Sequence, residues 1–371
     1  MKTKIGQTYI VYLKNSNHYF QFEEPSWFVF SKLRQGYRSV TIANKFSERY
    51  CIDLNESLRF VNRFKLEMQH QLESSLSEKQ DNSSLHFSFH PTDSKKYRIN
   101  NIVIEFRFAS DYLCSLIHPL LSHFEVYTSE SFDNEFELFY FENEIFLRVN
   151  GQISGDWNFE ETAYLKGVIF LQLANVIYKK STNEWLMSLH ASSVSNGKSS
   201  IFFTAPPNHG KTTFAMLLKK VGYRLISDDF IPVDHDGKAY PFPLSVSIRQ
   251  STELADEIIP ELNSLPVKYI TPDKSVRFAS FNETYNYADF ILPIKAIVFI
   301  KFDKNSQFSF EKLNSDQSML LFFEQSWIAP GIDAAEKLFS LLPRLQFYKL
   351  TYCDFDRALA SINDLFNNSY E

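Results

Sequence analysis

The chain has 371 residues, of which 44% are hydrophobic and 22% charged, as in folded globular proteins and unlike disordered, collagen-like or coiled-coil chains. This length suits two or three domains. The net charge of −6 argues against a general nucleic-acid binder, whose affinity would come from neutralising phosphates. The three scattered cysteines predict neither a zinc site nor a disulfide framework, and the apolar runs are too short for a secretory signal or a membrane span. We therefore expect a cytoplasmic protein without a nucleic-acid or membrane partner.

The first 75 residues have the pattern of a small α+β domain. Aromatic and β-branched runs at residues 9–13 and 18–22, separated by a Lys-Asn-Ser-Asn turn, predict a β-hairpin. Helices are predicted over residues 26–34 and 39–50. A third helix begins at the capping box Asp53-x-x-Glu56 and continues as an amphipathic helix to about Leu72.

A polar, serine-rich stretch follows this domain and predicts a linker, which we place at residues 76–85. Residues 1–80 contain 12 Lys and Arg against 8 Asp and Glu, so the small domain is basic and the remainder of the chain is acidic.

The N-terminal domain resembles the PqqD-like fold, a small winged-helix recognition domain found in pathways that modify ribosomally made peptides. The resemblance is carried by Phe28–Gly36, Val40–Phe46, Tyr50, Asp53–Ser57 and the helix Leu58–Leu72. It implies that a precursor's leader peptide adds as a strand to the sheet edge beside the last helix, with backbone hydrogen bonds supplying affinity. The alternative for the same residues is a docking or dimerisation domain.

The remaining residues, 86–371, predict a larger α/β domain with a mixed sheet. Strand-like runs at 101–106 and 135–141, followed by a helix over about 160–179, predict a front sheet. A further strand is expected over 295–302, and a terminal helix over 354–366.

The stretch with legible chemistry is a strand, a loop and a helix around a Gly-Lys-Thr tripeptide. The strand Ser200–Thr204 leads into Ala-Pro-Pro-Asn-His-Gly-Lys-Thr-Thr and then a helical run, Phe214–Val221, which is the context of a Walker A loop. Backbone amides at such a helix start point at phosphate, and the helix dipole favours negative charge there. Lys211 would reach the β- and γ-phosphates, the Thr212 hydroxyl would hold Mg²⁺, and Gly210 would let the backbone approach closely.

The loop departs from the G-x-x-x-x-G-K-[ST] pattern because Ala205 replaces the first glycine, and Pro206 and Pro207 lack N–H donors. The amides that wrap phosphate are the later ones, from Asn208 to Thr213, and all of them keep a donor.

Two acidic residues and a histidine accompany the loop. Ser227-Asp228-Asp229 follows a short strand, and Leu189-His190-Ala191-Ser192 precedes the loop's strand. Paired carboxylates at a strand end can divide the work, one on a metal and one taking a proton from an attacking hydroxyl.

This region resembles the HPr kinase/phosphorylase superfamily, in particular HPr-kinase-like proteins of peptide-modification clusters. The resemblance is carried by His190, Gly210-Lys211-Thr212 and Gly222-Tyr223-Arg224-Leu225-Ile226-Ser227-Asp228-Asp229, in the family's order. It implies catalytic roles for Asp229 as general base, Lys211 on the transferring phosphoryl group and His190 near the γ-phosphate, with Thr212 and Asp228 at the metal. The implied nucleotide-binding residues are Asn208, His209, Gly210, Lys211, Thr212, Thr213 and Arg249, the implied cofactors are ATP and Mg²⁺, and a homo-oligomer is possible.

Together these features predict a kinase that uses Mg-ATP to phosphorylate a Ser or Thr hydroxyl of a ribosomally made precursor peptide. The resemblance to HPr kinases would place a metal-binding Glu at about the position of Ser247. The main alternative is a non-catalytic nucleotide-binding chaperone or adaptor, for which Ala205, the two prolines and Ser247 would be marks of lost catalysis. A third hypothesis, a winged-helix transcription regulator with a nucleotide sensor, fits the basic N-terminus but not the overall charge.

Overall fold

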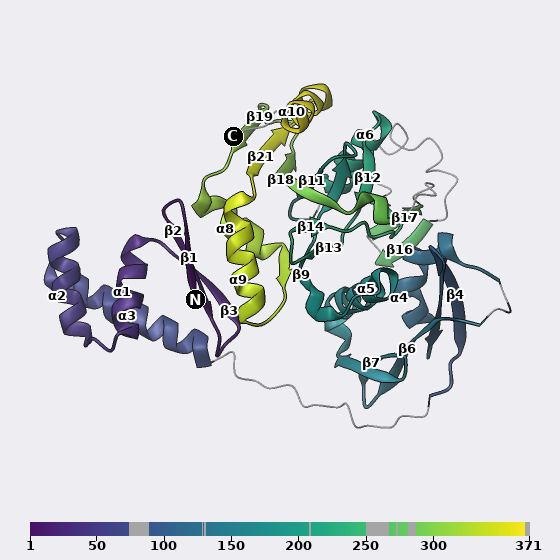
Figure 1. The fold of residues 1–371 in the computed structure, drawn as a ribbon, viewed down its shortest axis with the longest axis horizontal. Helices are drawn as coiled ribbons and strands as arrows, with labels where there is room; N and C mark the ends of the chain where they lie inside the picture. Colours follow the sequence, from purple (N-terminus) through teal and green to yellow (C-terminus); the bar gives the residue numbers. More distant parts are fainter. Residues whose placement is uncertain are drawn as a thin grey trace. The chain divides into compact units, whose positions relative to one another are not determined.

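The computed structural model describes residues 1–73, 89–127, 129, 131–207, 209–249, 267–271, 274–280 and 287–367. The chain forms two compact units (Figure 1). Unit 1 contains Met1–Gln80, Leu313–Glu324 and Pro330–Arg344, and unit 2 contains the rest of the chain. The predicted linker at 76–85 lies outside the described residues.

Unit 1 begins with a three-stranded antiparallel sheet followed by three helices. The strands are β1 (Lys2–Ile5), β2 (Thr8–Leu13) and β3 (His18–Phe22), in the order β1-β2-β3. The helices are α1 (Glu24–Arg34), α2 (Ser39–Tyr50) and α3 (Leu54–Glu73). The hairpin and all three helices match the prediction, whereas β1 had no counterpart in it.

Local chemistry explains the helix boundaries of unit 1. Cys51 adopts a left-handed conformation that ends α2. The Asp53 carboxylate then accepts hydrogen bonds from the backbone N–H groups of Asn55 and Glu56, at 2.8 and 3.1 Å, and so caps the start of α3. The apolar faces of the three helices meet one side of the sheet in a core that contains Val11, Phe22, Val29, Phe30, Ile42, Phe46, Val61 and Phe64.

Two helices from late in the sequence complete unit 1. These are α8 (Ser315–Glu324) and α9 (Ile332–Leu341), the latter followed by the short helix η6 (Leu342–Arg344). The Tyr19 ring stacks on Phe323 and meets the edge of Phe339, with centroid distances of 5.5 and 6.1 Å. The sequence-based division had placed α8 and α9 in the larger domain.

Unit 2 is built on a mixed sheet of ten strands among the described residues. Its main path runs β12-β10-β11-β18-β14-β13-β9-β20, with β21 beside β18 and β19 beside β21. Strands β11, β18 and β21 are parallel, and β10 is antiparallel to both of its neighbours, so the predicted α/β class with a mixed sheet is confirmed. The bounds are β9 (Trp185–Leu189), β10 (Ser192–Ser195), β11 (Ser200–Thr204), β12 (Arg224–Ser227), β13 (Ile231–Asp234), β14 (Lys238–Ala239), β18 (Leu292–Phe302), β19 (Ser309–Lys312), β20 (Ser326–Ile328) and β21 (Phe347–Tyr352).

A second, five-stranded sheet packs through helix α5 onto this framework. It runs β4-β5-β6-β7-β8 and is accompanied by two α-helices and several short 3₁₀ helices. The bounds are β4 (Asp93–Ile99), β5 (Ile102–Phe108), α4 (Asp111–Leu121), η1 (Ser122–Phe124), β6 (Asn134–Phe141), β7 (Glu144–Val149), β8 (Gln152–Trp157), η2 (Phe159–Glu161), α5 (Thr162–Tyr178) and η3 (Thr182–Glu184).

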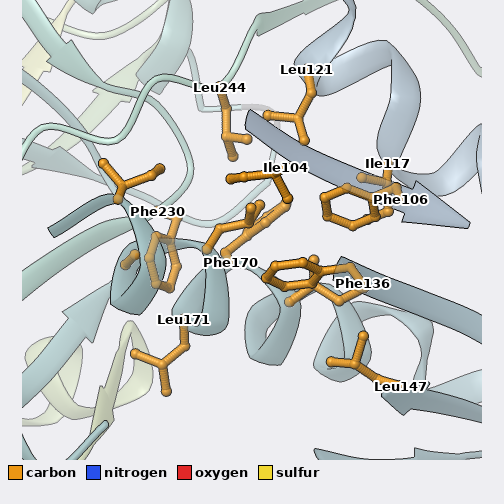
Figure 2. Close-up of a cluster of buried hydrophobic side chains, with 14 of the residues drawn as sticks. Ile104, Phe106, Ile117, Leu121, Phe136, Leu147, Phe170, Leu171, Phe230 and Leu244 are labelled. Atoms are coloured by element: carbon orange, nitrogen blue, oxygen red, sulfur yellow. The ribbon is translucent and has the colours of Figure 1, made fainter. Parts of the chain in front are cut away.

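Helix α5 is apolar around most of its circumference, as expected for a helix enclosed on several sides. Phe106 and Phe136 of the five-stranded sheet stack at 4.7 Å, while Phe170 of α5 meets Phe230 at 5.7 Å (Figure 2). One continuous core therefore joins this sheet, α5 and the segment that follows β12.

Another core of unit 2 lies under α6 (Lys211–Lys220) and α10 (Phe355–Asn367) and includes Ile201, Phe203, Phe214, Leu218, Val298, Leu350 and Ile362. A small sheet of β15 (Val246–Arg249), β17 (Lys274–Ala279) and β16 (Val267–Thr271), and the helix η5 (Tyr287–Phe290), complete the described elements. Within the described part of the chain, no helix is long and apolar enough to cross a membrane.

Candidate functional site

The loop between β11 and α6 ends at a glycine whose backbone conformation and packing are well defined. Gly210 stands immediately before α6 with φ of +86°, a conformation that L side chains rarely adopt. A Cβ atom at this position would lie 3.3 Å from Cβ of Phe302, so the close packing of the loop also favours glycine. The Phe302 N–H donates to the carbonyl of His209 at 3.2 Å and holds the loop against the end of β18.

The histidine of this loop stabilises the loop itself. His209 Nδ1 lies 3.2 and 3.0 Å from the carbonyl oxygens of Pro206 and Pro207, so this nitrogen carries the proton and donates. Its neighbour Asn208 lies outside the described residues.

Helix α6 begins directly after the loop, at Lys211, and its first backbone N–H groups have no acceptor within the helix. Its first helical hydrogen bond is donated by Phe214 to the Gly210 carbonyl, which leaves the N–H groups of Lys211, Thr212 and Thr213 without a partner inside the helix. Three amides at the positive end of a helix form a site suited to an anion such as a phosphate.

Asp228, directly after β12, is buried and interacts with two hydroxyl groups. The Thr212 hydroxyl lies 3.1 Å from both of its carboxylate oxygens, and the Ser192 hydroxyl donates to Oδ1. Burial raises the pKa of Asp228, and the neighbouring Asp229 carboxylate raises it further.

Asp229 lies beside Asp228 but contacts a lysine and a histidine in place of hydroxyl groups. Its Oδ1 is 2.8 Å from Lys211 Nζ and 3.3 Å from His190 Nε2. Although burial alone would raise its pKa, the hydrogen bonds and charges of His190 and Lys211 outweigh burial and hold the pKa of Asp229 below its ordinary value. Its side chain is 46% exposed, so this ionised carboxylate is accessible to a substrate.

The backbone at Asp229 is also unusual. Its φ is +67°, in the left-handed region that costs an L residue about 1 kcal/mol. The Ser227 hydroxyl lies 2.6 Å from the Phe230 carbonyl and 3.0 Å from the Phe242 carbonyl, and it supports the turn by sharing its single proton with these acceptors. Because of this turn, the two adjacent carboxylates point to different partners.

His190 is fixed through its backbone at the end of β9. Its N–H donates to the Gln325 carbonyl at 2.9 Å, and its own carbonyl accepts from the Thr204 hydroxyl at 3.1 Å. The imidazole is 51% exposed while Nε2 faces Asp229. The structure thus brings His190, Lys211, Thr212, Asp228 and Asp229 together at the start of α6.

Two of the other candidate residues lie on elements that contact each other. Thr213 is on the first turn of α6. Arg249 is the last residue of β15, a strand that packs against α6 from the small three-stranded sheet, with Ser247 on the same strand.

Sequence reasoning missed Ser192 as a member of the site. Its signal was present in the segment Leu189-His190-Ala191-Ser192, since a polar residue that begins a fully buried strand needs a partner. Its partner Asp228 is 36 residues away, and only the pairing of β10 with β12 shows that they meet.

The donor set fits a divalent cation that arrives with a nucleotide. Thr212 and Asp228 supply hydroxyl and carboxylate oxygens, the ligands Mg²⁺ prefers. Within the described residues, no group of three or more His, Cys, Asp and Glu side chains could hold a metal ion. Nucleotide-bound Mg²⁺ needs only one or two protein oxygens, because phosphate oxygens and water complete its shell.

Comparisons with known proteins find similarity among solved structures. No family model matches the chain, and no curated protein matches it. Among solved structures, the chain is similar to the Hpr(Ser) kinase/phosphatase from Coxiella burnetii, with 12% identity and a TM-score of 0.21, over 49% of this chain and 88% of that one. A similarity this low does not establish a shared fold or activity.

Proposed function

We propose that the chain is an ATP-dependent kinase that phosphorylates a Ser or Thr hydroxyl of a ribosomally made precursor peptide in the cytoplasm. The observation that supports this best is the cluster at the start of α6, where Lys211 and His190 both contact an exposed Asp229 carboxylate and Thr212 contacts a buried Asp228. Phosphoryl transfer depends mainly on positioning and charge stabilisation, and these residues offer both.

Asp229 is suited to accept the proton of the attacking hydroxyl, because its side chain is accessible and His190 and Lys211 both contact its Oδ1 atom. As the hydroxyl oxygen bonds to the γ-phosphorus, its proton passes to Asp229 and the bond to the ADP oxygen breaks. His190 would hold the carboxylate in place, and Lys211 would stabilise charge on the transferring phosphoryl group.

The metal role falls to Thr212 and Asp228. When bound, Mg²⁺ neutralises negative charge on the nucleotide's phosphate oxygens. Asp228 would keep the Thr212 hydroxyl oriented, since both carboxylate oxygens lie 3.1 Å from it.

The proposal that the acceptor is a peptide rests on unit 1. A groove of about 340 Å³ lies between β3 and α3 and is lined by Phe20, Gln21, Phe22, Ser26, Phe60, Arg63, Phe64, Glu67 and Met68. In the described part of the chain, β3 is an edge strand of its sheet, so its outer backbone groups can pair with an added strand. An extended segment of the precursor is the occupant that fits both a groove lined by aromatic and polar side chains and an open strand edge.

The test is transfer to the precursor peptides encoded beside the gene, followed by intact-mass analysis after incubation with Mg-ATP. The wild type is expected to add one phosphate to a peptide. Lys211→Ala is expected to reduce transfer by about 10²-fold or more, because the transferring charge loses its cation. Lys198→Ala removes an exposed cation outside the cluster and serves as the matched control.

Two outcomes would contradict the proposal. Turnover of Lys211→Ala near that of the wild type would refute the assignment of the phosphate-binding loop. ATP binding by the wild type without transfer to any encoded peptide would favour the adaptor hypothesis instead.

A further inference from the structure

Ser192 lies in the large sheet, between the two strands that lead into the candidate site. It begins β10, which lies between β11, the strand that leads into the phosphate-binding loop, and β12, the strand that leads into Asp228. It pairs with Phe203 of β11, and the next residue, Ser193, pairs with Ser227 of β12. This register brings the Ser192 hydroxyl to Asp228 Oδ1.

The hydrogen bonds of Asp228 explain why this second hydroxyl matters. Thr212 has one hydroxyl proton, and its oxygen lies at the same distance, 3.1 Å, from both carboxylate oxygens. That contact alone does not decide how the carboxylate is rotated. The bond from Ser192 distinguishes Oδ1 from Oδ2 and fixes the rotation, and it satisfies an acceptor that is shielded from water.

We infer that Ser192 is a positioning residue for the cation site of Thr212 and Asp228. By fixing the Asp228 carboxylate, it keeps the Thr212 proton directed at the carboxylate and the Thr212 oxygen available to the cation. The inference rests on the proposed function, since it concerns the cation that accompanies ATP. Residues that orient metal ligands typically affect metal affinity by about 10- to 100-fold when removed.

The chain provides a matched control at the next position. Ser193 is on the same strand and is as fully buried as Ser192, but its hydroxyl has no hydrogen-bond partner among the described residues. Ser192→Ala and Ser193→Ala therefore remove the same atom from neighbouring buried positions, and only the first removes a bond to Asp228.

The experiment measures Mn²⁺ binding, by electron paramagnetic resonance, to the full chain with a non-hydrolysable ATP analogue. Ser192→Ala is expected to weaken Mn²⁺ binding by about tenfold or more, and Ser193→Ala by less than about twofold. The affinity for the analogue without metal is expected to be the same in both variants. Ser192→Cys, of similar volume but with a weaker donor, is expected to weaken Mn²⁺ binding severalfold and tests the inference if the alanine variant fails to fold.

Equal Mn²⁺ affinity in the wild type and in a folded Ser192→Ala or Ser192→Cys variant would overturn this inference and leave the proposed function standing. Equal losses in Ser192→Ala and Ser193→Ala would also overturn it, because packing and not the hydrogen bond would then be responsible. If the wild type bound the analogue but no Mn²⁺, both the inference and the proposed function would fail.

Discussion

Two adjacent carboxylates in this chain occupy contrasting environments, and this contrast is the basis of the proposed chemistry. Asp228 is buried among hydroxyl groups, whereas Asp229 is accessible and contacts a lysine and a histidine. The sequence predicted that such a pair divides its work, and the geometry is consistent with that. The sequence could not show which hydroxyl orients Asp228, because the contact with Ser192 depends on strand pairing between residues 36 positions apart.

Asp229→Asn tests the division directly. The amide keeps the shape but accepts a proton poorly, so we expect transfer to the peptide to fall by about 10²-fold while ATP affinity changes little. Asparagine also tolerates the left-handed backbone at this position, where φ is +67°, so the turn should persist. Rates and ATP affinity are measured on the same preparation; a collapse of ATP binding would reassign Asp229 to the metal and make Asp228 the base.

A partly buried histidine outside the site, His123, predicts how stability depends on pH. His123 Nδ1 lies 2.9 Å from the Ser245 hydroxyl, and burial lowers the pKa of His123 from 6.5 to about 4. Between about pH 6.5 and 4, His123 therefore binds a proton in the unfolded chain but not in the folded chain. Protonation favours the unfolded chain, so the free energy of unfolding falls as the pH falls through this range.

We expect the free energy of unfolding to fall, between pH 7 and about 4.5, by about 2 kcal/mol more in the wild type than in His123→Gln. Urea denaturation at the two pH values measures this difference. His70→Gln, a change on the exposed side of α3, is the control and should behave as the wild type does. An identical pH dependence in the wild type and His123→Gln would show that His123 does not titrate this way.

At the scale of elements, local sequence signals predicted the bounds of helices and strands that depend on residues close together in the chain. β3, β11 and α2 have the predicted bounds, and α6 begins at Lys211, just before the predicted helical run. β1 was missed because its four residues alternate lysine with Thr3 and Ile5 and lie at an exposed edge, so they carry little apolar signal. The packing of α8 and α9 on the N-terminal sheet was missed because it joins residues about 300 positions apart.

Two tyrosines of that sheet give a matched test of the packing. The Tyr12 hydroxyl donates to Asn17 at 2.8 Å and accepts the Gly331 N–H at 3.1 Å. The Tyr19 hydroxyl is buried and has no hydrogen-bond partner among the described residues. We expect Tyr12→Phe to destabilise unit 1 by about 1 kcal/mol and Tyr19→Phe to be neutral or slightly stabilising, since only the first change breaks satisfied bonds. Thermal unfolding measures both, and a larger loss in Tyr19→Phe would contradict the packing described here.

At the scale of the molecule, the residues proposed to bind the peptide and those proposed to transfer the phosphoryl group belong to different units. The groove beside β3 lies in unit 1, and the residues proposed to handle phosphate lie in unit 2. A tethered recognition unit raises the local concentration of a docked substrate, so contacts around the acceptor hydroxyl can be weak. Removing residues 1–80 would test this only crudely, because α8 and α9 would lose the sheet on which they pack.

Point changes in the groove separate docking from chemistry more cleanly. Phe20 on β3 and Phe60 on α3 line the groove, whereas Leu66 on α3 is 69% exposed and does not. We expect the double change Phe20→Ala and Phe60→Ala to raise the apparent KM for the full-length precursor by about tenfold or more. The kcat at saturation and the KM for ATP should stay within about twofold, because docking of this kind acts as uniform binding. Leu66→Ala, a smaller loss of apolar volume on the same helix outside the groove, should match the wild type. An unchanged KM for the precursor in a folded double variant would remove the recognition role and return unit 1 to the docking or dimerisation alternative.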